Sequence, residues 1–417
     1  MVINREHWEE VSVPTVVAKL HTPTTSPTST ELFTAAIKDI SESLQVHGLN
    51  FKISDTTRIW SLFGASTAAG APSKPPSTRW PFTRGYNTIG MSAGRTNNTK
   101  SVGTIGGYFK FRDPDSNERV IGITCYHVVR EGPQGEVDDR EYNPPIPPCP
   151  CPRTPEIEPT GATNVNHPCL YPALPDMEAA KAIYSTQASL PIPPGLHPAI
   201  AAEENAKRQE ARRKLHEINS YNPNIGNVLA VSGWRNVALH ASSSSSSATA
   251  ASNAILIDWA CIEIRSNTQS TYSANYIGDI ARDLQYAQSP AAPYRTSNDH
   301  HQLISKTIHL PSQNTILFKK GRTTGITAGT LAPSAPALIR IKKGLLPAAR
   351  AFVITRDVLS GQHFAGNGDA GAWCLTGGGE LVGLFVAGDE RDGSGLMIPI
   401  EVVMEDIERT LGLSPGS

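Results

Sequence analysis

Three short segments of this chain contain residue types that can activate a hydroxyl nucleophile, and they occur in the order histidine, aspartate, glycine-rich turn. His127 lies in the apolar stretch 122–129, and Asp258 lies in the apolar stretch 254–264. The third segment, residues 366–371, reads Gly-Asn-Gly-Asp-Ala-Gly. A hydroxyl attacks a carbonyl group when an imidazole takes its proton, and a buried carboxylate holds that imidazole in the required tautomer. The first two segments therefore predict a general base and the group that orients it.

Each segment also has an ordinary structural explanation when it is considered alone. A histidine after an apolar strand is often a hydrogen-bonded core residue, and an aspartate at the end of a strand often caps a turn. The apolar residues on both sides of Asp258 favour a buried carboxylate beside a histidine. The order of the three segments, more than any one of them, indicates a catalytic site.

These segments resemble those of the chymotrypsin-like serine proteases. The resemblance is greatest to the intracellular trypsin-like proteins of fungi, in which a Lys-Gly-Arg-Thr-Thr-Gly stretch precedes the active-site turn. In this chain that stretch is residues 320–325. The resemblance covers residues 100–130 and 225–413, and it implies a serine endopeptidase fold and mechanism.

The resemblance assigns a role to each part of the site. It implies that His127 is the base, that Asp258 orients it, and that the N–H groups of Gly368 and Ala370 form the oxyanion hole. Ala370, however, stands where the family has its nucleophilic serine, and a methyl group has no lone pair with which to attack. Cys374 lies on the next predicted strand and offers no substitute. The chain as printed is therefore expected to be catalytically inactive.

Two explanations of Ala370 remain open from the sequence. The gene encodes a natural pseudoprotease that acts as a peptide-binding, protein-binding or regulatory module, or the serine was replaced deliberately to obtain an inert protein. The intact His127, Asp258 and glycine turn favour a recent or deliberate loss, because a long-decayed site is expected to lose its other members too.

The resemblance also implies a substrate pocket, lined by Phe364 and by the strand residues Val386, Ala387 and Gly388. Trypsin-like members have an acid at the position of Phe364, where it binds an Arg or Lys side chain. Its absence here predicts a preference for an apolar or small side chain. Asp389, next to this strand, keeps a basic preference open.

A second cluster of reactive side chains lies in a proline-rich region and comprises Cys149, Cys151, His167 and Cys169. These four groups could bind one zinc ion tetrahedrally. Their spacing is not one of the familiar zinc patterns, so unligated side chains are the simpler interpretation and no cofactor is expected.

Composition restricts the classes of partner. The chain has 417 residues, 39% of them hydrophobic, and a formal net charge of -1, which argues against an electrostatic grip on nucleic acid. It has no apolar run of membrane-spanning length, no apolar segment of a secretory signal near Met1, and few cysteines. We expect a cytoplasmic protein that acts on a protein or peptide substrate, without nucleic acid or membrane partners; the oligomeric state stays open.

Plentiful glycine and proline between short apolar runs predict an all-β protein. The resemblance implies two antiparallel six-stranded β-barrels side by side, chymotrypsin-like. Apolar residues at helical spacing predict a helix at each end of the chain, over residues 30–46 and 402–411. The expected strands are 102–111, 119–129, 226–233, 254–264, 316–319, 325–331, 338–342, 351–355, 372–375 and 381–386.

We expect three parts along the chain. They are an N-terminal helical segment with a linker over residues 1–85, a first barrel over 86–265, and a second barrel with the C-terminal helix over 266–417. The first barrel contains a proline-rich insertion, 131–220, which ends in a charged helix, and a serine-rich loop, 240–252. The N-terminal helix could dock on the barrel, bind a partner or cover the cleft.

Overall fold

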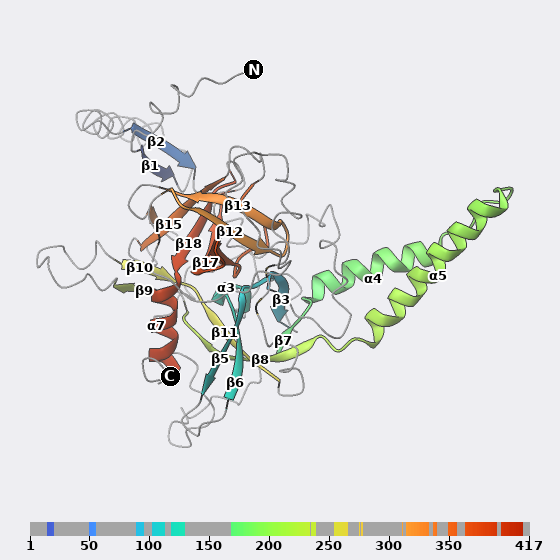
Figure 1. Ribbon diagram of the computed structural model, residues 1–417, viewed down its shortest axis with the longest axis horizontal. Helices are drawn as coiled ribbons and strands as arrows, with labels where there is room; N and C mark the ends of the chain where they lie inside the picture. Colours follow the sequence, from blue (N-terminus) through green and yellow to red (C-terminus); the bar gives the residue numbers. More distant parts are fainter. Residues whose placement is uncertain are drawn as a thin grey trace, which may run out of the picture.

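Two antiparallel β-barrels form the body of the chain, and a long helical hairpin projects from the first of them (Figure 1). This arrangement confirms the expected all-β, chymotrypsin-like fold. In this computed structural model, the described residues are 15–20, 50–55, 89–95, 102–112, 118–129, 168–233, 235–238, 254–265, 275, 277, 311, 314–332, 337–339, 349–356, 363–389 and 393–411.

The first barrel is a seven-stranded antiparallel sheet in the order β4-β3-β7-β8-β11-β6-β5. Turn-forming residues between β5 and β6 allow these two strands to pair as a hairpin, with Gly107 opposite Ile123. Six strands were expected, and the seventh, β7, comes from the insertion. The strands are β3 (Met91–Arg95), β4 (Gly103–Ile105), β5 (Gly107–Arg112), β6 (Glu118–Thr124), β7 (Pro168–Leu170), β8 (Asn224–Val231) and β11 (Ala260–Ile264).

The second barrel is a closed ring of six strands in the order β13-β12-β16-β17-β18-β15, which a pairing between β13 and β15 closes. Strand β17 is apolar along its length and buried at every position, as befits the centre of a barrel wall. The strands are β12 (Ile316–Gly321), β13 (Gly325–Leu331), β15 (Ala349–Arg356), β16 (Trp373–Thr376), β17 (Leu381–Gly388) and β18 (Gly395–Pro399). Three further strands extend the sheet from β15: β9 (Arg235–Ala238), β10 (Ala254–Ile257) and β14 (Ala337–Ile339).

The two barrels share one hydrophobic core, and Trp373 of β16 is at their contact. Its indole lies against Gly106 and Gly107 of the first barrel, where an added Cβ atom would come within 2.2 Å of the ring at either position. The ring of Phe109 packs against it with centroids 4.9 Å apart. Only glycine therefore leaves room for this tryptophan between the barrels.

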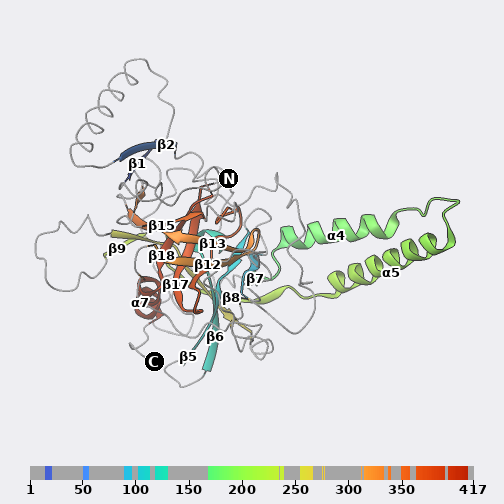
Figure 2. The same ribbon diagram turned by 45° about the horizontal axis from the view of Figure 1, so that its top comes forward.

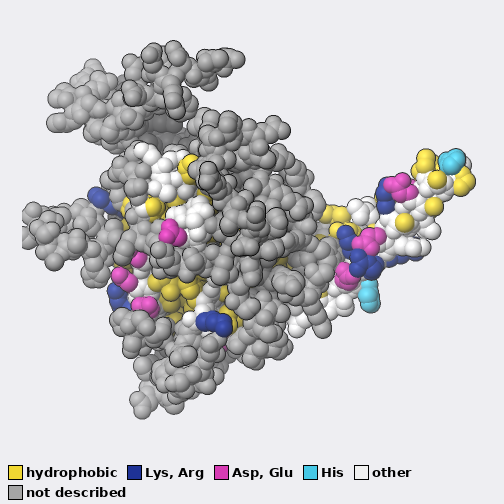
Figure 3. Space-filling model, viewed as in Figure 1, with side chains coloured by type: hydrophobic (Ala, Val, Ile, Leu, Met, Phe, Trp, Pro, Cys, Tyr) yellow, Lys and Arg dark blue, Asp and Glu magenta, His cyan; other side chains and the backbone are white. Residues whose placement is uncertain are grey.

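The helical hairpin consists of α4 (Leu174–Ser189) and α5 (Pro198–Ser220), and both views show it extending away from the barrels (Figures 1 and 2). Helix α5 agrees with the expected charged helix, whereas the sequence did not predict α4. Figure 3 shows charged side chains along the hairpin. On α5, ion pairs between residues one helical turn apart stabilise the helix, such as Nζ of Lys207 with Oε1 of Glu203 at 2.8 Å.

The C-terminal helix α7 (Ile400–Leu411) packs on β17 and β18 of the second barrel. Its buried face includes Ile400, Val403 and Ile407, in agreement with the amphipathic pattern of the sequence. None of the helices in the described part of the chain is both long and apolar enough to cross a membrane.

Near the N-terminus, β1 (Thr15–Leu20) and β2 (Asn50–Asp55) form a parallel two-stranded sheet that begins with Thr15 opposite Asn50. The sequence did not predict these strands. The expected helix 30–46, the linker before residue 85 and the serine-rich loop 240–252 lie outside the described residues. The limits of the three expected parts stay a prediction.

Candidate active site

His127 lies on α3 (Tyr126–Val129), a four-residue helix that directly follows β6, and all four residues are buried. The sequence predicted a strand through Val129, and this part of the prediction is wrong. Strand β6 ends at Thr124 because the backbone then turns, with the N–H of Val128 donating to the carbonyl of Cys125 at 3.2 Å. The turn moves His127 out of the sheet and toward the second barrel.

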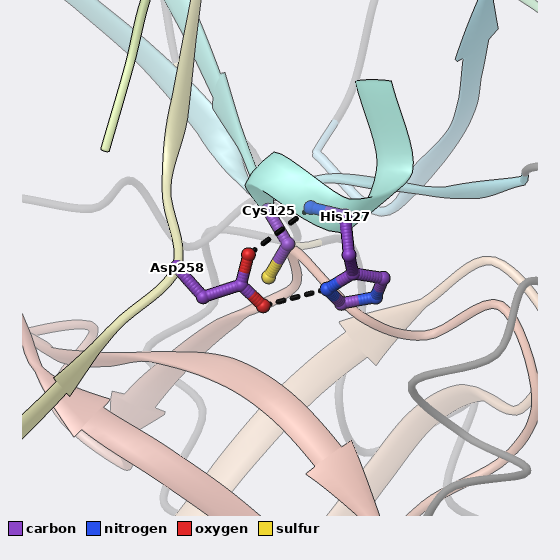
Figure 4. A group of neighbouring side chains, drawn as sticks. All are labelled: Cys125, His127 and Asp258. Atoms are coloured by element: carbon purple, nitrogen blue, oxygen red, sulfur yellow. Dashed lines mark hydrogen bonds and ion pairs between the residues drawn. The ribbon is translucent and has the colours of Figure 1, made fainter. Parts of the chain in front are cut away.

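Asp258 occupies the break between β10 and β11, and it is fully buried. Its Oδ2 lies 2.6 Å from Nδ1 of His127, and its Oδ1 accepts a hydrogen bond of 3.1 Å from the backbone N–H of the same residue (Figure 4). A proton on Nδ1 is held by this carboxylate, so Nε2 is the ring nitrogen that accepts a further proton. The structure thus brings together the first two residues of the sequence hypothesis.

Two side chains that the sequence analysis missed hold the residue after Asp258. The backbone N–H of Trp259 donates to Oγ of Ser232 at 2.8 Å, and its indole N–H donates to Oδ2 of Asp406 at 2.8 Å. Both acceptors are buried. The one available signal was Asp406, an acid on the apolar side of the C-terminal helix. These bonds fix the backbone from which the Asp258 carboxylate projects.

The glycine-rich segment forms a tight turn between residues 366 and 372. The N–H of Asp369 donates to the carbonyl of Gly366 at 3.1 Å, and the N–H of Gly371 donates to the carbonyl of Phe385 at 2.8 Å. Gly368 and Gly371 have φ angles of 92° and 96°, in the region that residues with a Cβ atom rarely adopt. A Cβ atom on Gly371 would also lie 2.1 Å from the carbonyl oxygen of Thr104, so glycine is required there twice over.

Thr104 of the first barrel binds this turn of the second barrel at two points. Its Oγ1 donates to the carbonyl of Gly368 at 2.8 Å, and its N–H donates to the carbonyl of Ala370 at 2.7 Å. The turn also touches the end of β6, since a Cβ atom on Gly371 would lie 3.2 Å from the N of Cys125. The turn therefore packs against the strand end that leads into α3.

The N–H groups of Gly368 and Ala370 lie on this turn, at the positions expected for oxyanion donors. Among the described residues, neither group has a hydrogen-bond acceptor. Ala370 is buried, with 4% of its surface exposed. Two amide N–H groups without an acceptor can donate to a negatively charged oxygen, and their role as oxyanion donors stays a prediction.

The four residues expected to line a substrate pocket are all buried. One of them, Phe364, lies just before the glycine-rich turn, and the other three are the last residues of β17. The ring of Phe364 belongs to the core of the second barrel, where it meets Phe385 edge-on with centroids 5.9 Å apart. Asp389, directly after the strand, is buried as well. A pocket lined by Phe364, Val386, Ala387 and Gly388 stays a prediction.

Of the four expected zinc ligands, one lies among the described residues. Cys169 lies buried on β7, and burial raises the pKa of its thiol to about 12. A thiol binds zinc as the thiolate, which this environment disfavours. Cys149, Cys151 and His167 lie outside the described residues.

A second group of possible metal ligands lies in the site itself, where single atoms of Cys125, His127 and Asp258 are within 4.8 Å of one another (Figure 4). The thiol of Cys125 donates to the carbonyl of Phe385 at 3.4 Å, and burial raises its pKa well above the usual value. A cation would require Cys125 to lose this proton and His127 to leave Asp258. The group is better explained as a set of hydrogen-bonded side chains.

The family model of peptidase family S64 matches residues 206–414, half of the chain, a span that includes Asp258 and the glycine turn but not His127. No curated protein matches.

Three solved structures that resemble this chain carry the name of a protease or of a chymotrypsin. Protease A of Thermobifida fusca aligns with 77% of this chain and 95% of its own length, at 13% identity and a TM-score of 0.33. A glutamic acid specific serine protease aligns over 77% and 97%, at 11% identity and a TM-score of 0.34. A chymotrypsin of Cellulomonas bogoriensis aligns over 36% and 66%, at 15% identity and a TM-score of 0.24.

Proposed function

This chain belongs to peptidase family S64, and from that premise we propose that it is a trypsin-like serine endopeptidase in which Ala370 replaces the nucleophile. The observation that carries the proposal is the buried pair of His127 and Asp258, joined at 2.6 Å beside a turn with two unpaired amides. Its substrates are proteins or peptides.

In a form with a serine at position 370, each group has one task. The imidazole of His127 takes the hydroxyl proton at Nε2 while the serine oxygen bonds to the substrate carbonyl carbon, and Asp258 stabilises the imidazolium. The backbone N–H groups of Gly368 and of the serine at position 370 stabilise the negative charge on the carbonyl oxygen. The C–N bond then breaks as His127 passes the proton to the leaving amine, and water hydrolyses the acyl-enzyme by the same route.

The chain as printed lacks the first of these steps. A methyl group forms no bond to the carbonyl carbon, and removal of the nucleophile lowers kcat by roughly 10⁶-fold in enzymes of this mechanism. The remaining groups support only substrate binding and the residual rate from the oxyanion hole.

The test restores the hydroxyl with Ala370→Ser and treats the folded protein with a fluorophosphonate probe. We expect one label per chain at position 370, and none on the chain as printed. In the Ala370→Ser background, His127→Ala should abolish rapid labelling, because the serine then has no base. A folded Ala370→Ser protein that the probe does not label would contradict the proposal.

Ala370 favours a second candidate function, a pseudoprotease that binds a peptide or protein without cleaving it. The retained His127–Asp258 pair and glycine turn would then serve to hold an extended peptide. This candidate expects the chain as printed to bind a peptide in calorimetry and to release it intact. A serine codon at position 370 in the source gene would exclude it.

A further inference from the structure

The most deeply buried ion pair among the described residues lies outside the His127–Asp258 pair. Nζ of Lys319 is 2.6 Å from Oδ2 of Asp369, and neither side chain has any exposed surface. Removing two opposite charges from water carries a desolvation penalty that their attraction offsets only when the geometry is good and other hydrogen bonds are satisfied. A pair of this kind in the wall of the second barrel calls for a role beyond stability.

Asp369 stands between Gly368 and Ala370, the two residues whose N–H groups are the expected oxyanion donors. Its backbone belongs to the peptide units that follow Gly368 and precede Ala370. A rotation of the Asp369 backbone therefore turns the N–H of Ala370 and shifts that of Gly368. Whatever fixes Asp369 fixes the direction of the Ala370 N–H and restricts the movement of Gly368, the residue before it.

The carboxylate of Asp369 anchors the turn through both of its oxygens. Oδ1 accepts bonds from two backbone N–H groups of the β12–β13 connection, and Oδ2 accepts from the lysine, a hydroxyl and the first glycine of the turn. The donors are Thr323 N (2.9 Å), Thr324 N (3.2 Å), Lys319 Nζ (2.6 Å), Thr324 Oγ1 (2.6 Å) and Gly366 N (3.1 Å). The carboxylate thus links β12, the connection after it and the turn.

Lys319 supplies the positive charge of this network from β12. Its Nζ also donates to Oγ1 of Thr324 at 2.8 Å, and it lies 5.2 Å from the ring centroids of both Phe364 and Phe385. The aromatic rings hold the ammonium group away from water, which strengthens its attraction to the carboxylate. Gly321 leaves the approach open, because a Cβ atom there would lie 2.2 Å from Oδ1 of Asp369.

We propose that Lys319 is a positioning residue that acts through Asp369 to hold the Gly368 and Ala370 amides in the direction needed by an oxyanion. The inference rests on the proposed function. Without the ammonium group, a buried carboxylate charge is left unpaired and moves toward water, and the turn moves with it. The amides then lose their alignment while the substrate-binding surface elsewhere is unchanged.

The test uses the Ala370→Ser protein and the fluorophosphonate probe, whose phosphoryl oxygen occupies the position of the oxyanion. We expect Lys319→Met to lower the maximal labelling rate by about 10²-fold, as loss of one oxyanion donor does, with the inhibition constant unchanged within about twofold. Lys319→Arg, which keeps the charge, should restore part of the rate. If Lys319 had a purely structural role, its replacement would not lower the maximal labelling rate while leaving the inhibition constant unchanged.

Lys320→Met is the matched control, because it removes the same charge from the next residue of β12. The Lys320 ammonium group donates instead to the carbonyl of Ile277 at 2.8 Å. Its labelling rate should equal that of the parent. Labelling of Lys319→Met at the rate of this control would overturn the proposal.

If Lys319→Met does not fold, the double variant Lys319→Met/Asp369→Asn removes both buried charges together. Asn has one acceptor oxygen in place of two, so the labelling rate should remain below that of the parent even when the protein folds. A parental rate would overturn the proposal, and so would failure of the double variant to fold, because it would assign the pair to the fold alone.

A readout that needs no catalysis separates this proposal from the proposed function. In the chain as printed, the amides of residues 366–372 should exchange with deuterium at least about tenfold faster in Lys319→Met than in Lys320→Met, because a released turn opens more often. Equal exchange would overturn the positioning role. Absence of labelling in the Ala370→Ser parent would count against the proposed function instead.

Discussion

Asp258 binds His127 through both carboxylate oxygens, with Oδ2 2.6 Å from the ring Nδ1 and Oδ1 3.1 Å from the backbone N. The imidazole therefore cannot rotate without breaking a bond to a fully buried carboxylate, which is costly. Because the ring and the backbone share one partner, the side-chain orientation of His127 is set by the fold and needs no substrate. Nε2 is left as the proton-accepting nitrogen.

The first prediction concerns this pair in the Ala370→Ser protein. Asp258→Asn should lower the rate of fluorophosphonate labelling by about 10⁴-fold, because an amide stabilises the wrong tautomer of the imidazole. Glu263→Gln is the control, since Glu263 is an acid on the following strand that pairs with Arg119 at 3.0 Å. Equal labelling rates in the two variants would show that Asp258 does not orient the base.

The second prediction concerns the contact between the barrels at Thr104. Thr104→Val keeps the shape of the side chain but removes the hydroxyl that donates to Gly368 and accepts from the N–H of Arg322 at 3.1 Å. The free energy of unfolding should fall by about 1–3 kcal/mol, because the buried carbonyl of Gly368 and the partly buried N–H of Arg322 lose a partner. Urea denaturation measures it.

The control for Thr104 is Thr355→Val, which removes an exposed hydroxyl that donates to the carbonyl of Thr330 at 3.2 Å. The carbonyl of Thr330 can accept a hydrogen bond from water instead, so the midpoint of unfolding should change little. A Thr104→Val loss no larger than this control would show that the inter-barrel bonds are not needed for stability.

The third prediction concerns pH and two buried thiols. Burial raises the pKa of Cys169 and of Cys374 to about 12 in the folded chain. The folded protein therefore keeps protons that the unfolded chain releases near pH 8.5, and this part of the stability is present below that pH and lost as the pH rises toward 12. At about pH 9.5 each thiol should account for a loss of about 1.4 kcal/mol.

The measurement compares unfolding free energies between pH 7 and pH 10 in the parent and in Cys169→Ala/Cys374→Ala. The parent should lose more stability with rising pH than the double variant, since the other ionisable groups are common to both. Parallel curves would mean that these thiols titrate normally in the folded state.

The fourth prediction concerns the base of the helical hairpin. Nε of Arg322 donates to Oδ2 of Asp176 at 2.7 Å, a second bond joins the other oxygen, and the side chains are 10% and 4% exposed. Asp176→Ala should destabilise the fold by about 3–5 kcal/mol, because it leaves a nearly buried guanidinium unpaired. Glu203→Ala, which breaks a solvent-exposed pair on α5, should leave thermal unfolding unchanged. Similar melting of both variants would contradict this role for Asp176.

The sequence predicted the parts of the site that depend on local patterns. The apolar stretches around His127 and Asp258 predicted burial, and the glycines at 366, 368 and 371 predicted a tight turn, because in each case neighbouring residues determine the outcome. The all-β class followed from short apolar runs between turn residues, whereas the two barrels were implied by the resemblance to chymotrypsin-like proteases. The short helix at His127 was missed, because the adjacent valines favour a strand and a tertiary bond to Asp258 overrides that preference.

Other features could not be predicted, because they depend on contacts between distant segments. In the sequence, Lys319 resembles a polar residue on the exposed side of a strand. The ammonium group can be buried only because the fold places the carboxylate of Asp369 beside it. Helix α4 lacks a clear apolar stripe, because only Asp176 and Met177 at its base are buried. Strand β7 is three residues long, too short for a periodic signal.

The packing of Trp373 on two glycines restricts how this sequence can drift. A mutation that gives either Gly106 or Gly107 a side chain removes the space that the indole occupies, and it can persist only if position 373 first changes to a smaller residue. Natural variation at these sites should therefore be correlated. Homologues with a bulky residue on the first barrel here should have a small one in place of the tryptophan, and a side chain at either glycine position should not occur together with the tryptophan.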